Sequence, residues 1–155
     1  MHESSREYVE TLHPSFEKLL NMPPVKIGTL PKAIPKKCIY LFSEGANHLY
    51  VGRTRRLRQR LREHSVAGAL HNQAVFAFRL AREITGQTIA TYSVKGSRKA
   101  LSLEGPFADA FTLCKTRVRN MDLRFIEEID PLRQALLEIY VAVVLGTKYN
   151  DFDTH

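Results

Sequence analysis

Two short β-rich segments joined by a turn are the feature that most limits the folds open to this chain. Residues 38–42 and 48–51 are rich in β-branched and aromatic side chains, and residues 43–47 between them have turn chemistry. These segments predict an antiparallel hairpin. Because side chains alternate along a strand, we expect Tyr40 on the first strand and Tyr50 on the second to converge.

The periodicity of apolar residues predicts helices before and after the hairpin. A helical arm interrupted at Pro14 is expected over residues 5–21, and a proline-rich connector follows. Beyond the hairpin, the pattern predicts helices over 55–63, 72–85, 106–120 and 131–145, a weak strand at 88–94 and a stronger one at 122–127. The first of these helices is expected to begin after Thr54 as its N-cap.

These elements predict a small α/β fold at a length that suits one domain with one core. Its sheet, mixed or antiparallel, would be built from the hairpin and residues 122–127, with helices flanking it and the site lying across one sheet face. We expect residues 1–37 to form the arm and connector, and residues 38–155 to form the domain, with a helical insert at about 66–120.

The charge of the chain favours a polyanionic partner. Lysine and arginine number 23 against 16 aspartates and glutamates, which leaves a formal charge of +7. Six of the ten residues from 53 to 62 are arginine, whose planar fork pairs with phosphate oxygens. Nucleic acid is the natural partner, although a solvated basic helix face would have the same composition.

Other features argue against a membrane protein, an exported protein or a disulfide framework. The longest apolar run, residues 135–146, is too short to span a bilayer, is interrupted by Glu138 and predicts a core helix. No secretory signal pattern is found at the N-terminus, so a cytoplasmic protein is expected. Cys38 and Cys114 lack any metal-finger spacing and are expected to be reduced core residues.

The hairpin carries a paired motif. Cys38-Ile39-Tyr40, nine intervening residues and Tyr50-Val51-Gly52 resemble the paired signature of the GIY-YIG nucleases. Arg60 and His64, four residues apart on the next helix, are similar to the arginine and histidine or tyrosine that follow in that family. Glu138 in an apolar helix and Asn150 near the C-terminus resemble its metal-binding glutamate and closing asparagine. The match covers residues 38–64 and 122–150, with cysteine in place of the first glycine.

The resemblance implies a metal-dependent endonuclease that hydrolyses phosphodiester bonds, with Mg²⁺ or Mn²⁺ at Glu138. Arg60 would hold the scissile phosphate, His64 would accept a proton or orient the phosphate, and Tyr40 or Tyr50 would be the general base or orient the water. Asn150 would hold Glu138 or a backbone loop. Further phosphate contacts are expected from the remaining arginines of the basic segment, Arg53, Arg55, Arg56, Arg58 and Arg62.

Each candidate also has an ordinary structural alternative. Glu138 would need a partner in an apolar helix, and an arginine would serve as well as a metal ion. A lone helix histidine such as His64 is more often structural, hairpin tyrosines are commonly half-buried strand aromatics, and Asn150 could be a turn residue. Arg60 could be one more solvated arginine.

For the whole protein, a DNA endonuclease of restriction, phage defence or mobile-element biology is expected. The alternatives are a non-catalytic nucleic-acid-binding module and a nuclease acting on RNA. A homodimer would make paired cuts easier.

Overall fold

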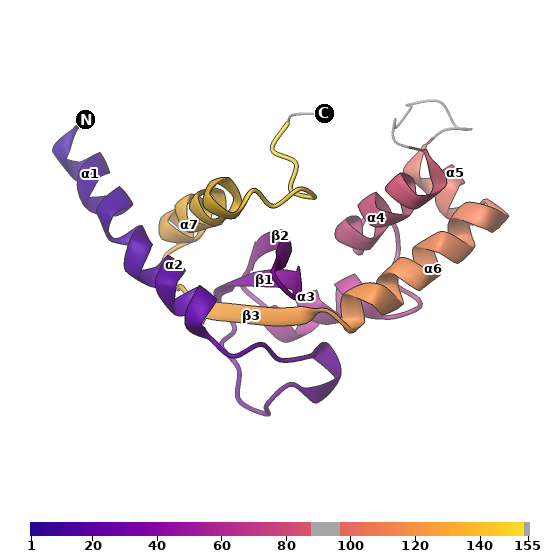
Figure 1. The fold of residues 1–155 in the computed structure, drawn as a ribbon, viewed down its shortest axis with the longest axis horizontal. Coiled ribbons are helices and arrows are strands. Elements are labelled where there is room, and N and C mark those ends of the chain that lie inside the picture. Colours follow the sequence, from indigo (N-terminus) through magenta and orange to yellow (C-terminus); the bar gives the residue numbers. More distant parts are fainter. Residues whose placement is uncertain (88–96, 154–155) are drawn as a thin grey trace. The chain divides into compact units, whose positions relative to one another are not determined.

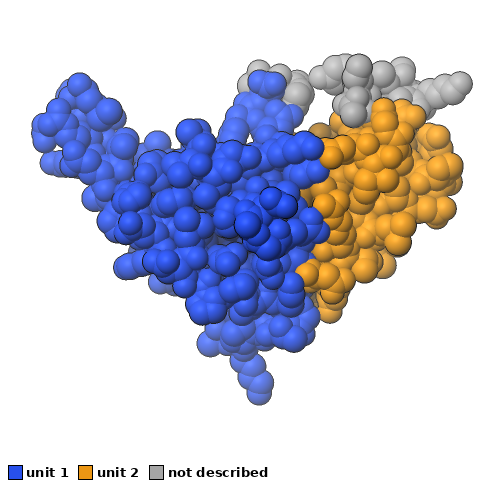
Figure 2. All heavy atoms as spheres, in the orientation of Figure 1, with its two compact units in different colours: residues 1–58, 121–155 blue, residues 59–120 orange. Residues whose placement is uncertain are grey.

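The computed structural model describes residues 1–87 and 97–153. It divides into two compact units, one made of Met1–Arg58 with Met121–His155 and the other of Gln59–Asn120 (Figures 1 and 2). The weak strand expected at 88–94 falls outside the described residues. In this described part of the chain, no helix is long and apolar enough to cross a membrane.

A three-stranded antiparallel sheet forms the centre of the first unit. Its strands are β1 (Cys38–Glu44), β2 (Asn47–Thr54) and β3 (Asp122–Glu127), in the order β2-β1-β3. The expected α/β fold is confirmed, and the sheet is purely antiparallel. The hairpin turn is tighter than expected because only Gly45 and Ala46 separate the strands, with Gly45 at a φ of 59° that favours glycine.

Two helices cover one face of this sheet. They are α2 (Leu12–Asn21) and α7 (Pro131–Leu145), which contact each other and the strands. Their apolar side chains pack on the side chains that alternate toward that face, forming a buried core of Leu12, Phe16, Leu19, Ile39, Leu41, Val51, Leu137, Val141 and Ala142. The position of α7 against β1 and β2 is therefore set by the main core of the unit.

The N-terminal arm is partly buried in the first unit. Its first helix, α1 (Glu3–Glu10), buries no residue, whereas α2 contributes three side chains to the core. The arm is divided into two helices at Thr11. Pro14 therefore lies in the first turn of α2, where it removes no helical hydrogen bond. The connector holds a short 3-10 helix, Ile27–Thr29, and a β-bridge between Val25 and Leu123.

Helix α7 is half-buried, and the expectation of a core helix is wrong for its outer face. Ile139, Val143 and Val144 are 47%, 74% and 51% exposed. Only one side of α7 faces the sheet, so only Leu137, Val141 and Ala142 of its apolar side chains are buried. Asp130 caps the helix, and Gly146 ends it in the left-handed conformation, as its position predicted.

The second unit is helical. Helix α3 (Leu57–Ser65) begins in the first unit and continues into this one, followed by α4 (Val75–Thr85), α5 (Arg98–Leu103) and α6 (Gly105–Arg119). The core of the unit includes four buried phenylalanines from α4 and α6: Phe76, Phe78, Phe107 and Phe111. The segment that lies between the hairpin and β3 in the sequence therefore builds a second apolar core.

The start of α3 differs from the expected one. Thr54 does not cap the helix, because its Oγ1 accepts from the Arg56 N–H in a local turn (3.0 Å). The Leu57 N–H donates instead to the Lys36 carbonyl (3.0 Å), and the helix begins at Leu57. The connector before β1 thus satisfies a backbone donor at the start of α3.

Candidate active site

Tyr40 and Tyr50 converge on one face of the hairpin, as the alternation predicted. Their ring centroids lie 6.4 Å apart, and Tyr40 also contacts the edge of Phe42. Tyr40 is paired across the strands with Gly52, and a Cβ on that glycine would overlap the Tyr40 ring. Gly52 therefore leaves the space that the Tyr40 phenol occupies. This explains why the second half of the paired motif, Tyr50-Val51-Gly52, ends in glycine.

Glu138 of α7 is paired with an arginine. Arg53 Nε of β2 donates to Glu138 Oε2 at 2.9 Å, while the glutamate side chain is 18% exposed and the arginine 49%. Burial raises the pKa of Glu138 above its ordinary value, although Arg53 acts in the opposite direction. The arginine therefore compensates for only part of the cost of burying this carboxylate.

The tyrosines and the Arg53–Glu138 pair lie on opposite faces of the sheet. Arg53 is paired with Ile39, whose side chain packs in the core beneath α7, whereas Tyr40 is paired with Gly52. The expectation that the site lies across one sheet face is therefore wrong for the groups of the first unit. Because β2 is an edge strand, groups on both of its faces adjoin the same edge of the sheet.

Asn150 holds that edge in place. Its Oδ1 accepts from the Val51 N–H (2.9 Å) and its Nδ2 donates to the Val51 carbonyl (2.8 Å). The Tyr149 N–H also donates to the Leu49 carbonyl (3.2 Å). The side chain thus provides the two hydrogen bonds that a neighbouring strand would make and fixes the backbone between Tyr50 and Gly52.

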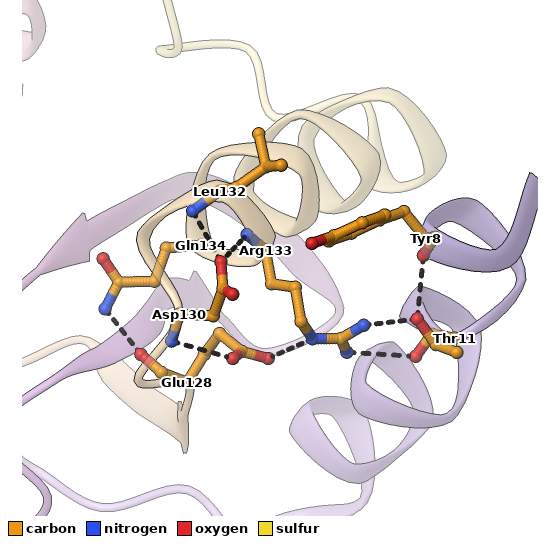
Figure 3. Close-up of polar contacts among 7 residues, drawn as sticks. All are labelled: Tyr8, Thr11, Glu128, Asp130, Leu132, Arg133 and Gln134. Atoms are coloured by element: carbon orange, nitrogen blue, oxygen red, sulfur yellow. Dashed lines mark hydrogen bonds and ion pairs between the residues drawn. The ribbon is translucent and has the colours of Figure 1, made fainter. Parts of the chain in front are cut away.

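A polar network fixes the start of α7 (Figure 3). Glu138 lies further along the same helix, so the network helps to set its position. Asp130 Oδ1 accepts from the Leu132 and Arg133 N–H groups (2.8 and 2.9 Å), and Arg133 Nε donates to Glu128 Oε2 (3.0 Å). Arg133 also donates to the hydroxyl and the carbonyl of Thr11. No motif in the sequence singled out these residues for this role, although an aspartate followed directly by Pro131 is a common helix start.

A further side chain joins α7 to β2. Gln134, 4% exposed, donates through Nε2 to the carbonyls of Glu128 (2.6 Å) and Thr54 (3.3 Å). One turn along α7 lies Glu138, so Gln134 helps to set the distance between that carboxylate and β2.

Arg60 and His64 lie on α3, in the part of that helix that belongs to the second unit. Arg60 Nη1 donates to Glu63 Oε2 (3.0 Å) and to the Gln73 carbonyl (2.9 Å), and its side chain is 23% exposed. The guanidinium is therefore held in one orientation. His64 is fully buried, and burial, reinforced by the charge of Arg60, lowers its pKa well below the ordinary value of 6.5. It is a neutral imidazole at neutral pH.

The buried histidine predicts a pH-dependent stability. In the unfolded chain, His64 binds a proton below about pH 6.5, but in the folded chain it does not until a much lower pH. The neutral His64 therefore contributes its full stability above pH ~6.5. Below that pH the free energy of unfolding should fall by up to about 1.4 kcal/mol for each pH unit. His48 and His71, whose pKa values are also lowered by burial, act in the same direction.

Urea unfolding between about pH 7.5 and 5.5 checks this expectation. His64→Gln should flatten the profile, whatever it does to stability at pH 7.5. A profile of unchanged slope would show that His64 is protonated in the folded protein.

The basic segment is not a uniform phosphate-binding surface. Arg55, Arg56 and Arg62 are exposed, but Arg58 Nη2 donates to the carbonyls of Pro31 and Lys32 (both 3.0 Å). Arg58 thus holds the connector, and Arg53 is paired with Glu138. Both roles depend on segments far away in sequence, which the local pattern of arginines could not indicate.

The residues fit a metal held by one protein carboxylate. Glu138 offers a hard oxygen ligand that remains partly exposed, and burial raises its pKa while Arg53 lowers it, so a nearby cation would favour its ionised form. No group of three or more histidine, cysteine, aspartate or glutamate side chains in the described residues could hold a metal ion. A cation here would need water and substrate oxygens to complete its shell.

The architecture and the site define a class. An antiparallel three-stranded sheet, a hairpin with paired tyrosines and a glutamate on the helix over its edge strand form a small α/β catalytic domain. A family model described as the GIY-YIG catalytic domain matches residues 36–150. The chain belongs to the GIY-YIG superfamily of nucleases, as the paired signature predicted. No curated protein and no solved structure matches the chain in the same comparisons.

Proposed function

We propose that this chain is a divalent-metal-dependent endonuclease that hydrolyses DNA phosphodiester bonds. The observation that carries the proposal is the partly exposed carboxylate of Glu138, which α7 places beside the edge strand of the GIY-YIG hairpin. The net positive charge favours a polyanionic substrate, and DNA is the substrate that we test first.

The side chains take distinct roles in this proposal. Arg60, oriented by Glu63 and Gln73, holds the scissile phosphate and neutralises the charge that develops on it. His64 is neutral at pH 7 and can accept a proton. Tyr50 is 9% exposed against 1% for Tyr40, so Tyr50 is the better candidate to orient the attacking water, and Tyr40 positions it.

Glu138 would hold Mg²⁺ or Mn²⁺ in the loaded enzyme. Such an ion, when bound, supplies Lewis-acid stabilisation of phosphate oxygens and lowers the pKa of a bound water. Asn150 keeps the edge of β2 fixed beside this site, and Asp130 and Gln134 fix the helix that carries the carboxylate. Positioning and electrostatic stabilisation, rather than a covalent intermediate, would then provide the rate enhancement.

A cleavage assay on four substrates tests the proposal. Plasmid, linear duplex, single-stranded DNA and RNA are incubated with the purified chain in Mg²⁺ or Mn²⁺, with EDTA as the control. Cleavage of DNA that EDTA abolishes is the expected result. Cleavage of RNA alone would mean that the substrate is RNA and not DNA. Binding without cleavage of any substrate would establish a non-catalytic nucleic-acid-binding module instead.

The Arg53–Glu138 pair makes a further prediction within this proposal. Because the guanidinium contacts the carboxylate that would hold the metal, the ion must compete with Arg53 for Glu138. Arg53→Gln should therefore bind Mn²⁺ several-fold more tightly in calorimetry, while Arg53→Lys, which keeps the charge, should stay close to the wild type. Weaker Mn²⁺ binding by Arg53→Gln would instead mean that Arg53 supports the ion.

A further inference from the structure

Most of the net charge of the chain belongs to the second unit. Residues 59–120 contain ten lysines and arginines but only four acidic residues, so this unit carries a net +6 of the total +7. Only Arg60 and Arg62 of that excess come from the basic segment at 53–62. The rest of the positive charge of this unit therefore lies outside the basic segment.

Part of this charge gathers around one aromatic ring. The guanidinium carbons of Arg82 and Arg98 lie 5.0 and 5.6 Å from the centroid of Phe78. Phe78 is fully buried and is itself packed against Phe107 (5.0 Å) and Phe111 (5.6 Å). One guanidinium comes from α4 and the other from the first residue of α5, so two helices direct their charges to the same buried ring.

Further cations surround this pair. After burial, the charges of Arg98 and Arg79 lower the pKa of Arg82, and the charges of Arg98 and Lys99 lower the pKa of His71. Nε and Nη2 of Arg82 are buried without a hydrogen-bond partner, and among the described residues no carboxylate pairs with Arg82, Arg98 or Lys99. The like charges of Arg82, Arg98 and Lys99 disfavour the fold where they lie close together, and a bound anion would offset that cost.

We propose that Arg79, Arg82, Arg98 and Lys99 form a phosphate-binding surface on the insert that contacts the backbone of the nucleic-acid substrate. This inference rests on the proposed function and adds a contact surface to it. The guanidinium groups of Arg82 and Arg98 are already oriented over Phe78, so they lose little rotamer freedom on binding. The charge of Arg82 and the planar fork of Arg98 suit phosphate oxygens. The surface would present four positive charges, more than a single phosphate needs for neutralisation, which favours a chain of phosphates.

Salt-dependent binding tests the surface. Arg82→Gln/Arg98→Gln is prepared in a Glu138→Gln background, and its affinity for a labelled DNA duplex is measured by fluorescence anisotropy over a range of NaCl concentrations. We expect binding on the order of tenfold weaker, and the slope of log K against log salt should fall by about two for two lost phosphate contacts. The matched control is Arg117→Gln/Arg119→Gln, which removes the same charge from the last turn of α6 and should change the slope far less.

Thermal unfolding separates this role from a structural one. If the cations are held together for a ligand, Arg98→Gln should have an unchanged or higher Tm, because it relieves repulsion. Arg82→Lys/Arg98→Lys, which keeps the charge, should retain the salt slope. A lower Tm with unchanged DNA binding would show that the arginines only pack on Phe78 and would overturn the proposal.

The two proposals fail in different ways. If the double glutamine variant binds DNA like its control while the wild type cleaves DNA, only the surface on the insert is refuted. If the wild type neither binds nor cleaves nucleic acid, the proposed function fails and this inference fails with it. Inorganic phosphate is the comparison ligand, and its competition with the duplex at millimolar concentration would assign the site to free phosphate instead.

Discussion

Glu138→Gln should lower the rate of DNA cleavage on the order of a thousandfold while leaving the fold intact, because the loss of several kcal/mol of transition-state stabilisation corresponds to a factor of that size. The amide keeps the shape of the side chain but removes the charge that a metal ion needs. The start of α7 is fixed by Asp130, Arg133 and Gln134, so the helix should stay in place. Single-turnover cleavage and a thermal melt measure the two effects separately.

Two further variants show whether Glu138 serves a metal ion or only Arg53. Glu7→Gln makes the same change on the exposed surface of α1 and should cleave normally. If the glutamate existed only to pair with the arginine, Arg53→Gln and Glu138→Gln would reduce activity and stability alike. The metal-site hypothesis predicts an asymmetry, with Glu138→Gln inactive and Arg53→Gln still active. Equal losses in the two variants would contradict it.

Gly52→Ala should be the most damaging small substitution in the hairpin. The added Cβ would overlap the Tyr40 ring, which is 1% exposed and packed against Phe42 and Tyr50, so the ring has no free space into which to move. Overpacking of this kind costs about 1–3 kcal/mol of stability. Displacement of the tyrosine should also reduce cleavage by roughly a hundredfold, since misplacement by about 1 Å has effects of that size.

Urea unfolding and cleavage rates of Gly52→Ala measure both effects. Gly68→Ala is the matched control, because a Cβ there meets nothing within 4 Å. Combining Gly52→Ala with Tyr40→Ala should give a smaller loss of stability than the sum of the two single changes, since the second change removes the overlapping ring. Additive losses would mean that Tyr40 and Gly52 do not share this space.

The hairpin and the order of the main elements were predictable because they depend on local patterns. Alternation placed Tyr40 and Tyr50 on one face, and proline and glycine marked the ends of α7. The short helix α5 was missed because its six residues hold too few turns for a periodic pattern, although Ser97 caps it by accepting from the Ala100 N–H.

The partners of the site residues were not predictable, because they depend on contacts between segments far apart in the chain. The contact of Arg53 with Glu138 joins residues on β2 and α7, and the two hydrogen bonds of Asn150 to Val51 join the C-terminal segment to an edge strand. The pattern in 53–62 suggested one group of phosphate-binding arginines, yet Arg58 and Arg53 hold other parts of the protein. Burial of His64 also depends on tertiary packing.

Whether Glu138 holds the metal ion can be measured by titrating Mn²⁺ into the chain with a non-hydrolysable DNA duplex and following the electron paramagnetic resonance signal of free Mn²⁺. We expect the wild type to bind Mn²⁺ and Glu138→Gln, folded and bound to the same duplex, to bind it at least tenfold more weakly. Equal Mn²⁺ binding by the two proteins would contradict the assignment of Glu138 as the metal-holding residue.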